Sequence, residues 1–193
     1  MDRAMAASGA YSPVVVLRPA DLSDRERVFE WCTASDATAA MIGPPEFPDH
    51  PVPTREEFFD DYHESFFDER GDGNGRVFVL EVAGRGVGCI SYDGLRDWHG
   101  FAELDIWIAS AVDQGRGWGS EAIRRLSGML LDVDTVAGLV IRPSRRNVRA
   151  IAAYRRAGFV ELDLGRHSLP ESWLSEGLDY SDAVVLVRLR GSQ

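Results

Sequence analysis

Three glycines at alternate positions, between a strand-like apolar run and a helix-like amphipathic run, constrain this sequence most. They lie in the segment Asp113-Gln114-Gly115-Arg116-Gly117-Trp118-Gly119-Ser120. Without Cβ atoms the glycines let the backbone turn sharply and present successive N–H groups, and the start of the following helix favours phosphate oxygens. The segment therefore predicts a loop that binds a diphosphate, with a flexible turn as the alternative interpretation.

A dinucleotide site of the Rossmann type fits this loop poorly. Its fingerprint requires a glycine where Ser120 stands and an acidic residue at the end of the next strand, where the sequence has Ile141-Arg142. All 21 basic residues are arginine, which excludes a Walker lysine and a Schiff-base lysine. The loop is therefore expected to hold another kind of diphosphate.

The remaining sequence predicts alternating strands and helices. Strands are expected at residues 14–18, 77–82, 86–92, 101–108, 136–141, 159–164 and 183–189. Two helices begin at the capping boxes Ser23-Asp24-Arg25-Glu26 and Thr54-Arg55-Glu56-Glu57, the second with Phe58, Tyr62 and Phe66 on one face. A third begins near Gly119 with Ala122, Ile123, Leu126, Met129 and Leu130 facing inward, and a fourth ends before Gly158. This order predicts an α/β (α+β) fold with a mixed, mainly antiparallel sheet of about six to seven strands and about four helices on both faces.

Size and composition predict one domain at 13–190 after a flexible leader at 1–12. The chain has 193 residues, of which 45% are hydrophobic, and its apolar runs are too short to span a membrane. Cys32 and Cys89 are far apart in the sequence and lie among apolar residues, which predicts neither a disulfide scaffold nor a thiolate metal site. The four histidines lack ligand spacing, so no metal is expected. These features predict a cytoplasmic protein without membrane contact.

Charge is distributed unevenly along the chain. The net charge is −10, which argues against nucleic-acid binding, yet residues 115–156 hold nine arginines against three acidic residues. This asymmetry suits a protein that binds an anionic cofactor with one segment and attracts a cationic acceptor with the rest. A generic acidic surface is the alternative interpretation.

A second pattern follows the loop at Asn147-x-x-Ala150-x-x-x-Tyr154-x-x-x-Gly158-Phe159. Asn147 and Tyr154 are seven positions apart, so both face one side of a helix with the small Ala150 between them. A helix cap and a core-edge aromatic are the alternative. Together with Gln114-Gly115-Arg116-Gly117-Trp118-Gly119, this pattern resembles the GCN5-related N-acetyltransferase (GNAT) superfamily over most of the chain.

The resemblance implies acetyl-coenzyme A as the cofactor. It implies that Tyr154 donates a proton to the departing sulfur, that main-chain N–H near Trp107 and Ile108 meets the thioester carbonyl, and that Asn147 holds the pantetheine arm. The implied cofactor-binding residues are Trp107, Ile108, Gln114, Gly115, Arg116, Gly117, Trp118, Gly119, Ser120, Asn147, Ala150 and Tyr154.

Two carboxylates predict the acceptor side of the site. Glu103, Asp105 and Trp107 alternate with apolar residues, so they share one strand face, and charged residues within an apolar strand are costly without a task. A solvated sheet face is the alternative. Asp105 lies ten residues before Gly115, where aminoglycoside 6′-N-acetyltransferases of this superfamily carry a carboxylate near the reacting amine. Asp105 is therefore the first candidate base, with Glu103 or a water relay as alternatives.

The resemblance to these antibiotic-modifying enzymes has one departure. Asp97-Trp98 is similar to the pair with which they hold sugar rings, and an exposed turn is the alternative. Arg142 stands where they commonly have a carboxylate, and it would repel a polycation. The acceptor is then less cationic or carries an acid group, as kasugamycin does. His99 is expected in a surface turn, although it is a further candidate base.

The sequence thus predicts an acetyl-coenzyme A-dependent N-acetyltransferase for an amine of a small cationic acceptor, with an aminoglycoside-type antibiotic as the favoured example. Antibiotic resistance by modification would follow. The alternatives are an acetyltransferase for the N-terminus of a ribosomal or other protein, and a non-catalytic acyl-coenzyme A sensor. The protein is expected to be a monomer or a homodimer. Residues 165–182 would cover the acceptor, contact a second subunit, or be a tolerated insertion.

Overall fold

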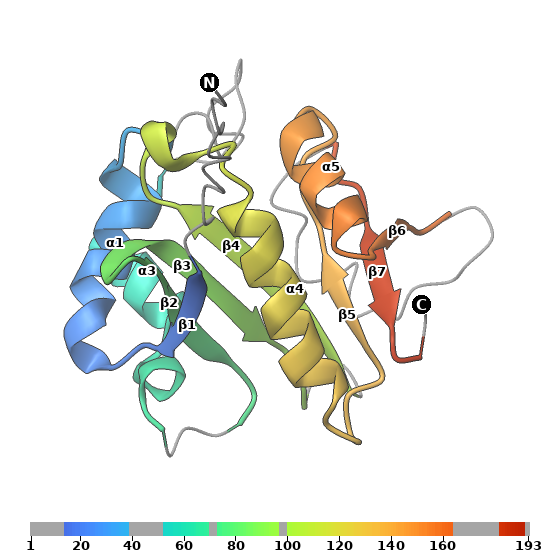
Figure 1. The fold of residues 1–193 in the computed structure, drawn as a ribbon. Helices are drawn as coiled ribbons and strands as arrows, with labels where there is room; N and C mark the ends of the chain where they lie inside the picture. The colour runs from blue at the N-terminus through green and yellow to red at the C-terminus, as the bar shows by residue number, and fades with distance from the viewer. Residues whose placement is uncertain (1–13, 39–51, 70–72, 97–99, 164–181, 192–193) are drawn as a thin grey trace, which may run out of the picture.

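The computed structural model describes residues 14–38, 52–69, 73–96, 100–163 and 182–191, whose strands form one seven-stranded sheet (Figure 1). The strands are β1 (Val15–Pro19), β2 (Arg76–Val82), β3 (Arg85–Asp93), β4 (Phe101–Ile108), β5 (Gly138–Ile141), β6 (Val160–Glu161) and β7 (Leu186–Leu189). The α-helices are α1 (Arg25–Ala34), α3 (Arg55–Asp61), α4 (Trp118–Leu131) and α5 (Val148–Arg156). Short 3₁₀ turns span Leu22–Asp24, Glu64–Phe67 and Ala111–Asp113.

The strand order is β1-β2-β3-β4-β5-β7-β6, and only the central β4–β5 pair is parallel. That parallel pairing runs from Phe101 opposite Gly138 to Glu103 opposite Val140. The second half of β4 therefore has β3 as a neighbour but extends beyond its pairing with β5. This mainly antiparallel sheet confirms the predicted fold class.

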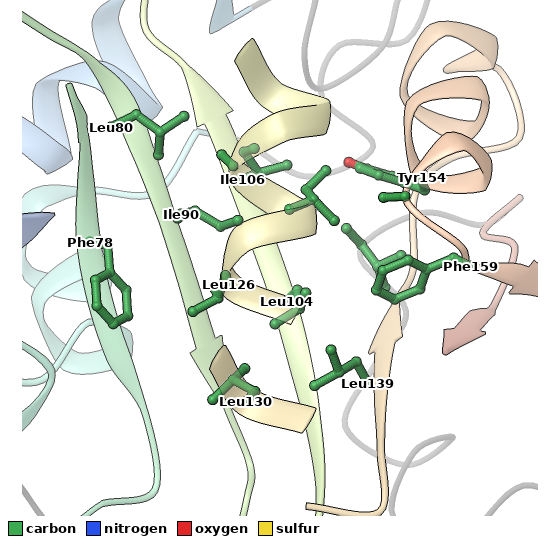
Figure 2. Packing of buried hydrophobic residues seen from close by; sticks show 14 of the residues in the cluster. Phe78, Leu80, Ile90, Leu104, Ile106, Leu126, Leu130, Leu139, Tyr154 and Phe159 are labelled. Carbon is green, nitrogen blue, oxygen red and sulfur yellow. The ribbon is translucent and has the colours of Figure 1, made fainter. Parts of the chain in front are cut away.

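Alternate residues of the central strands form two cores on opposite faces of the sheet. Phe78 and Leu80 of β2 pack in the core beneath α4, whereas Val77 and Val79 pack in the core beneath α1 and α3. Figure 2 shows Leu126 and Leu130 of α4 among the side chains packed against the strands. Among the helices of the described ranges, none combines the length and apolar character needed to cross a bilayer.

One of the two predicted capping boxes is displaced. Thr54 and Glu57 cap α3 as predicted, with the Glu57 carboxylate accepting from Thr54 N at 2.8 Å. At the other site, Asp21 and Asp24 form the box, and Ser23 donates its hydroxyl to Asp21. The prediction at Ser23 was wrong because Arg18 of β1, six positions before Asp24, holds the Asp24 carboxylate through two 2.8 Å hydrogen bonds.

Two expected helix faces also differ. Phe66 does not continue the face of Phe58, because α3 ends at Asp61 and Phe66 lies in a separate 3₁₀ turn. Met129 is 52% exposed, contrary to prediction, because it lies about 100° around the helix from the buried Leu130. Strands β5, β6 and β7 are shorter than expected by two to four residues, a boundary difference that leaves the strand order unchanged.

The two cysteines meet across the core beneath α1. Cys32 of α1 and Cys89 of β3 are free thiols that interact with each other. The hydrogen bond to Cys89 and burial raise the pKa of the Cys32 thiol. Their separation in the sequence thus gave no sign of their proximity.

Gly88 is expected to be essential for the pairing of β3 with β4. Its φ is +156°, and a Cβ would lie 1.9 Å from the Trp107 carbonyl oxygen. Gly88→Ala should therefore lower the free energy of unfolding by about 3 kcal/mol or more. Gly84→Ala is the control: its φ is +74° but no described atom lies within 4 Å of the added Cβ, so we expect a loss of about 1 kcal/mol. Thermal unfolding of both variants tests this, and equal losses would contradict it.

Candidate active site

The glycine loop connects β4 to the first turn of α4. Gly115 and Gly117 have φ of +75° and +83°, a region that favours glycine. Gly117 is the N-cap of α4, and within the described ranges no side chain caps this helix start. A Cβ on Gly117 would meet no described atom within 4 Å. The first N–H groups of α4 therefore face open space in which phosphate oxygens can approach.

An ion pair between a buried carboxylate and an exposed guanidinium fixes the start of this loop. The Asp113 side chain is only 4% exposed and accepts two hydrogen bonds, of 2.8 and 2.9 Å, from Arg85 at the start of β3. The Arg85 hydrogen bonds hold the pKa of Asp113 below its usual value, although burial opposes this shift. Arg116 donates to the Val112 carbonyl at 2.9 Å. The loop conformation thus depends on a contact with a neighbouring strand.

A cavity of about 350 Å³ lies between the loop, β4 and α5. Its lining includes the predicted cofactor residues Ile108, Gln114, Gly115, Gly117, Trp118, Gly119, Ser120, Asn147, Ala150 and Tyr154. Gln114 Nε2 is buried and has no hydrogen-bond partner in the described part of the chain. Since an unsatisfied buried amide costs about 1–3 kcal/mol, a ligand oxygen there would be stabilising. The cavity fits coenzyme A on this ground.

The main chain of β4 offers one donor to this cavity. Ala109 N donates to Val87 O at 2.9 Å, toward β3. Because N–H directions alternate along a strand, the N–H of Ile108 points away from β3, and that of Trp107 points toward it. Ile108 therefore fits the predicted carbonyl contact better than Trp107 does. The Trp107 side chain lies on the other face, where its Nε1 is buried without a partner among the described residues.

A second cavity, of about 400 Å³, lies on the other side of Tyr154. Its lining includes Asp61, Tyr62, Asp93, Glu103, Asp105, Trp107 and Arg142. Ile106, Asn147 and Tyr154 line both cavities. A cofactor in the first cavity and an acceptor in the second would meet at these three residues.

Both oxygens of Asp105 accept hydrogen bonds from the protein. Ile106 N donates to Oδ1 at 2.8 Å, and Tyr62 Oη donates to Oδ2 at 3.1 Å. Burial, and then the negative charge of Asp105, raise the pKa of Tyr62 well above its ordinary value, so this hydroxyl stays protonated. The Tyr62 ring stacks on Phe58 at 4.4 Å between centroids. Tyr62, the C-cap residue of α3, thus helps to hold the carboxylate in place at the cavity wall.

Glu103 is engaged by Arg142. The guanidinium donates Nε to Oε1 at 2.6 Å and Nη2 to Oε2 at 2.5 Å, and the side chains are 24% and 11% exposed. Such a bidentate pair is strong and directional. Arg142 therefore brings little net positive charge to the cavity. The repulsion of a polycation that the sequence predicts at this position is thus weakened. Glu103 is correspondingly less available as a base than Asp105.

Tyr154 and Asn147 occupy the junction of the two cavities. Figure 2 shows the Tyr154 side chain extending from α5 with its oxygen directed toward β4, and the residue is 7% exposed. Asn147 is the N-cap of α5 and accepts a hydrogen bond from Ala150 N at 3.1 Å. Its capping function is thus visible, while its contact with pantetheine stays a prediction.

Sequence reasoning missed Tyr62, Asp61 and Asp93. The sequence predicts Tyr62 only on one helix face with Phe58 and Phe66, and its hydroxyl, a polar group on that aromatic face, is the available signal. Asp97, Trp98 and His99 lie outside the described residues, as do residues 165–181. Within the described ranges no three His, Cys, Asp or Glu side chains gather as metal ligands.

Solved structures with the same fold include several acetyltransferases. An aminoglycoside 6′-N-acetyltransferase of type Ib, in complex with paromomycin and acetyl-coenzyme A, aligns with a TM-score of 0.68 at 21% identity, covering 92% of this chain and 94% of that one. Spermidine N-acetyltransferase from Vibrio cholerae, with coenzyme A and spermine, gives 0.67 at 19% identity over 92% and 96%. The ribosomal-protein α-N-acetyltransferase RimL, with coenzyme A, gives 0.68 at 17% identity over 93% and 96%. No curated protein sequence matches the chain.

A family model described as an acetyltransferase (GNAT) domain matches residues 15–160. The chain therefore belongs to the GNAT acetyltransferase family. This confirms the class of enzyme predicted from the sequence, an acetyl-coenzyme A-dependent N-acetyltransferase.

The ion pair of Asp113 predicts a pH-dependent stability. Because the pKa of Asp113 is lower in the folded state, the pair stabilises the fold above the unfolded value of about 4, and this stabilisation is lost as the pH falls through the depressed folded value. Asp113→Asn should cost roughly 1 kcal/mol at pH 7. Chemical denaturation should show this difference from the unmodified protein shrinking below pH 4.

Asp134→Asn is the matched control for Asp113→Asn. Asp134 pairs with Arg190, but its side chain is 98% exposed, so its loss should change stability little at either pH. If the loss of unfolding free energy in Asp113→Asn stays constant down to pH 3, the ion pair with Arg85 is not its origin.

Proposed function

We propose that this acetyltransferase acetylates an amine of a small cationic molecule, with an aminoglycoside-type antibiotic as the favoured acceptor and antibiotic resistance as the result. One observation carries the proposal: the second cavity joins the cofactor cavity at Tyr154 and is lined by the carboxylates Asp61, Asp93 and Asp105. Such a lining attracts a molecule with several positive charges. Two enzymes of the same fold are named as acetyltransferases of such molecules, aminoglycosides in one case and spermidine in the other.

The chain's own groups fit the three tasks of amine acylation. Bound acetyl-coenzyme A supplies the thioester. Asp105, held by Tyr62 and Ile106 N, binds the acceptor amine and takes its proton. The N–H of Ile108, directed away from β3, stabilises negative charge that develops on the carbonyl oxygen. Tyr154 Oη donates a proton at the sulfur and regains one from water.

The Glu103–Arg142 pair bears on which acceptor fits. Because Glu103 neutralises Arg142, and the described lining holds more carboxylates than cations, a fully cationic acceptor is favoured over one with an acid group. Aminoglycosides without a carboxylate, and polyamines, are therefore preferred to kasugamycin.

Two other functions use parts of the same site. Acetylation of a protein N-terminus needs the same chemistry with a peptide in the second cavity, and the ribosomal-protein acetyltransferase RimL has this fold. A non-catalytic sensor would need only the first cavity. Tyr154 at the junction favours catalysis over sensing.

A panel of acceptors distinguishes these functions. The protein is supplied with acetyl-coenzyme A and an aminoglycoside without acid groups, kasugamycin, spermidine, or peptides with free N-termini. Thiol release and product mass are followed. We expect turnover with the aminoglycosides and, more slowly, with spermidine. Turnover with peptides alone would establish N-terminal acetylation, and cofactor binding without turnover on any amine would establish a sensor.

Tyr154→Phe should lower kcat about ten- to a thousandfold with little change in the affinity for coenzyme A. The variant keeps the ring in the core and removes only the hydroxyl that would protonate sulfur. Steady-state kinetics and calorimetric titration of coenzyme A measure the two effects. Unchanged kcat would mean that another group or water provides the proton.

Asp105→Asn should lower kcat/KM for the acceptor about a hundredfold or more, because it removes the charge that binds and deprotonates the amine. Tyr62→Phe should cost about three- to tenfold, since it removes one hydrogen bond to that carboxylate. If Tyr62 acts through Asp105, the double variant should be no worse than Asp105→Asn. Additive losses would contradict this coupling, and weakened coenzyme A binding would indicate a folding defect.

A further inference from the structure

The nine arginines between residues 115 and 156 divide into two groups in the structure. Seven of them lie in ion pairs: Arg116 with Asp113, Arg124 and Arg125 with Glu121, Arg142 with Glu103, Arg145 and Arg155 with Glu161, and Arg146 with Asp182. Within the described ranges, Arg149 and Arg156 have neither an ion pair nor a hydrogen bond from their side chains. The basic segment thus keeps two uncompensated cations.

Both unpaired arginines lie on the cofactor side of α5. They are seven residues apart, so they share one face of the helix and are separated by roughly 10 Å along its axis. Both line the cofactor cavity. Arg149 Nη2 lies 3.1 Å from the position that a Cβ of Gly115 would take, so this guanidinium reaches the glycine loop. Arg155, between them in sequence, turns instead to Glu161 at 2.8 Å.

Unpaired guanidinium groups at the wall of an open cavity are suited to phosphate. Coenzyme A carries its negative charge at two places, the diphosphate and the 3′-phosphate of the ribose. The loop N–H groups and the start of α4 provide donors for one of them, and Arg149 lies beside that loop. Arg156 is two helical turns away, so it can meet only a phosphate that lies away from the loop.

We propose that Arg149 binds the diphosphate of the cofactor together with the glycine loop, and that Arg156 binds the 3′-phosphate. Arg156 then makes the enzyme select coenzyme A over dephospho-coenzyme A. The inference rests on the cofactor site and is independent of which amine is acetylated.

Calorimetric titration of coenzyme A and dephospho-coenzyme A into the full-length protein tests the assignment. The unmodified protein should bind coenzyme A about 5- to 50-fold more tightly than dephospho-coenzyme A. Arg156→Gln should lose this preference, with weaker binding of coenzyme A and unchanged binding of dephospho-coenzyme A. Arg149→Gln should weaken the binding of both by a similar factor.

Arg155→Gln is the matched control, because it removes the same charge from the same helix turn but outside the cavity. It should change neither affinity by more than about twofold, since its long-range field is screened by salt. Thermal unfolding of each variant checks that the fold is intact.

Several results would overturn the proposal. Equal affinity of the unmodified protein for the two nucleotides would remove the 3′-phosphate contact. If Arg155→Gln and Arg156→Gln lose equal affinity for coenzyme A, the effect comes from the overall charge of the protein and not from a contact with Arg156. If the protein does not bind coenzyme A at all, the cofactor site itself is refuted. If it binds both nucleotides as expected but acetylates no amine, only the proposed acceptor is refuted.

Discussion

The short parallel pairing of β4 with β5 is the constraint on which the site depends. Three residue pairs hold the strands together, up to Glu103 and Val140, and β4 then continues alongside β3 without further pairing to β5. This divergence leaves a main-chain donor of β4 at Ile108 unused by the sheet. It also gives α5 room to place Tyr154 between the two cavities. A longer pairing with β5 would use the Ile108 N–H in the sheet and would remove the space in which Tyr154 lies.

Charge compensation organises the same region. A guanidinium can hold a carboxylate through two parallel hydrogen bonds, and the pairs at Asp113 and Glu103 both use this geometry. One pair fixes the glycine loop, and the other neutralises Arg142 at the wall of the second cavity. Most arginines of the described ranges lie in ion pairs or donate hydrogen bonds, whereas Arg149 and Arg156 remain available to an anionic ligand.

The fold and the glycine loop could be predicted from the sequence because their signals are local. Alternation in β2 to β4 and the glycine spacing at 115–119 need only neighbouring residues. The acceptor cavity could not be predicted to the same extent, because its contacts join distant residues. Tyr62 reaches Asp105 across 43 positions, and Arg142 reaches Glu103 across 39. Register and helix placement decide such contacts, and neither is encoded in a short window.

The paired thiols of Cys32 and Cys89 have a practical consequence for enzymology. Thiolates react with aromatic disulfide reagents, whereas protonated thiols do so slowly. Since the hydrogen bond to Cys89 and burial raise the pKa of the Cys32 thiol, and Cys89 itself is buried in the core, the folded enzyme should consume little of such a reagent. The yellow colour that develops during turnover then reports the liberated sulfhydryl of the spent cofactor, and a rising blank would signal unfolding.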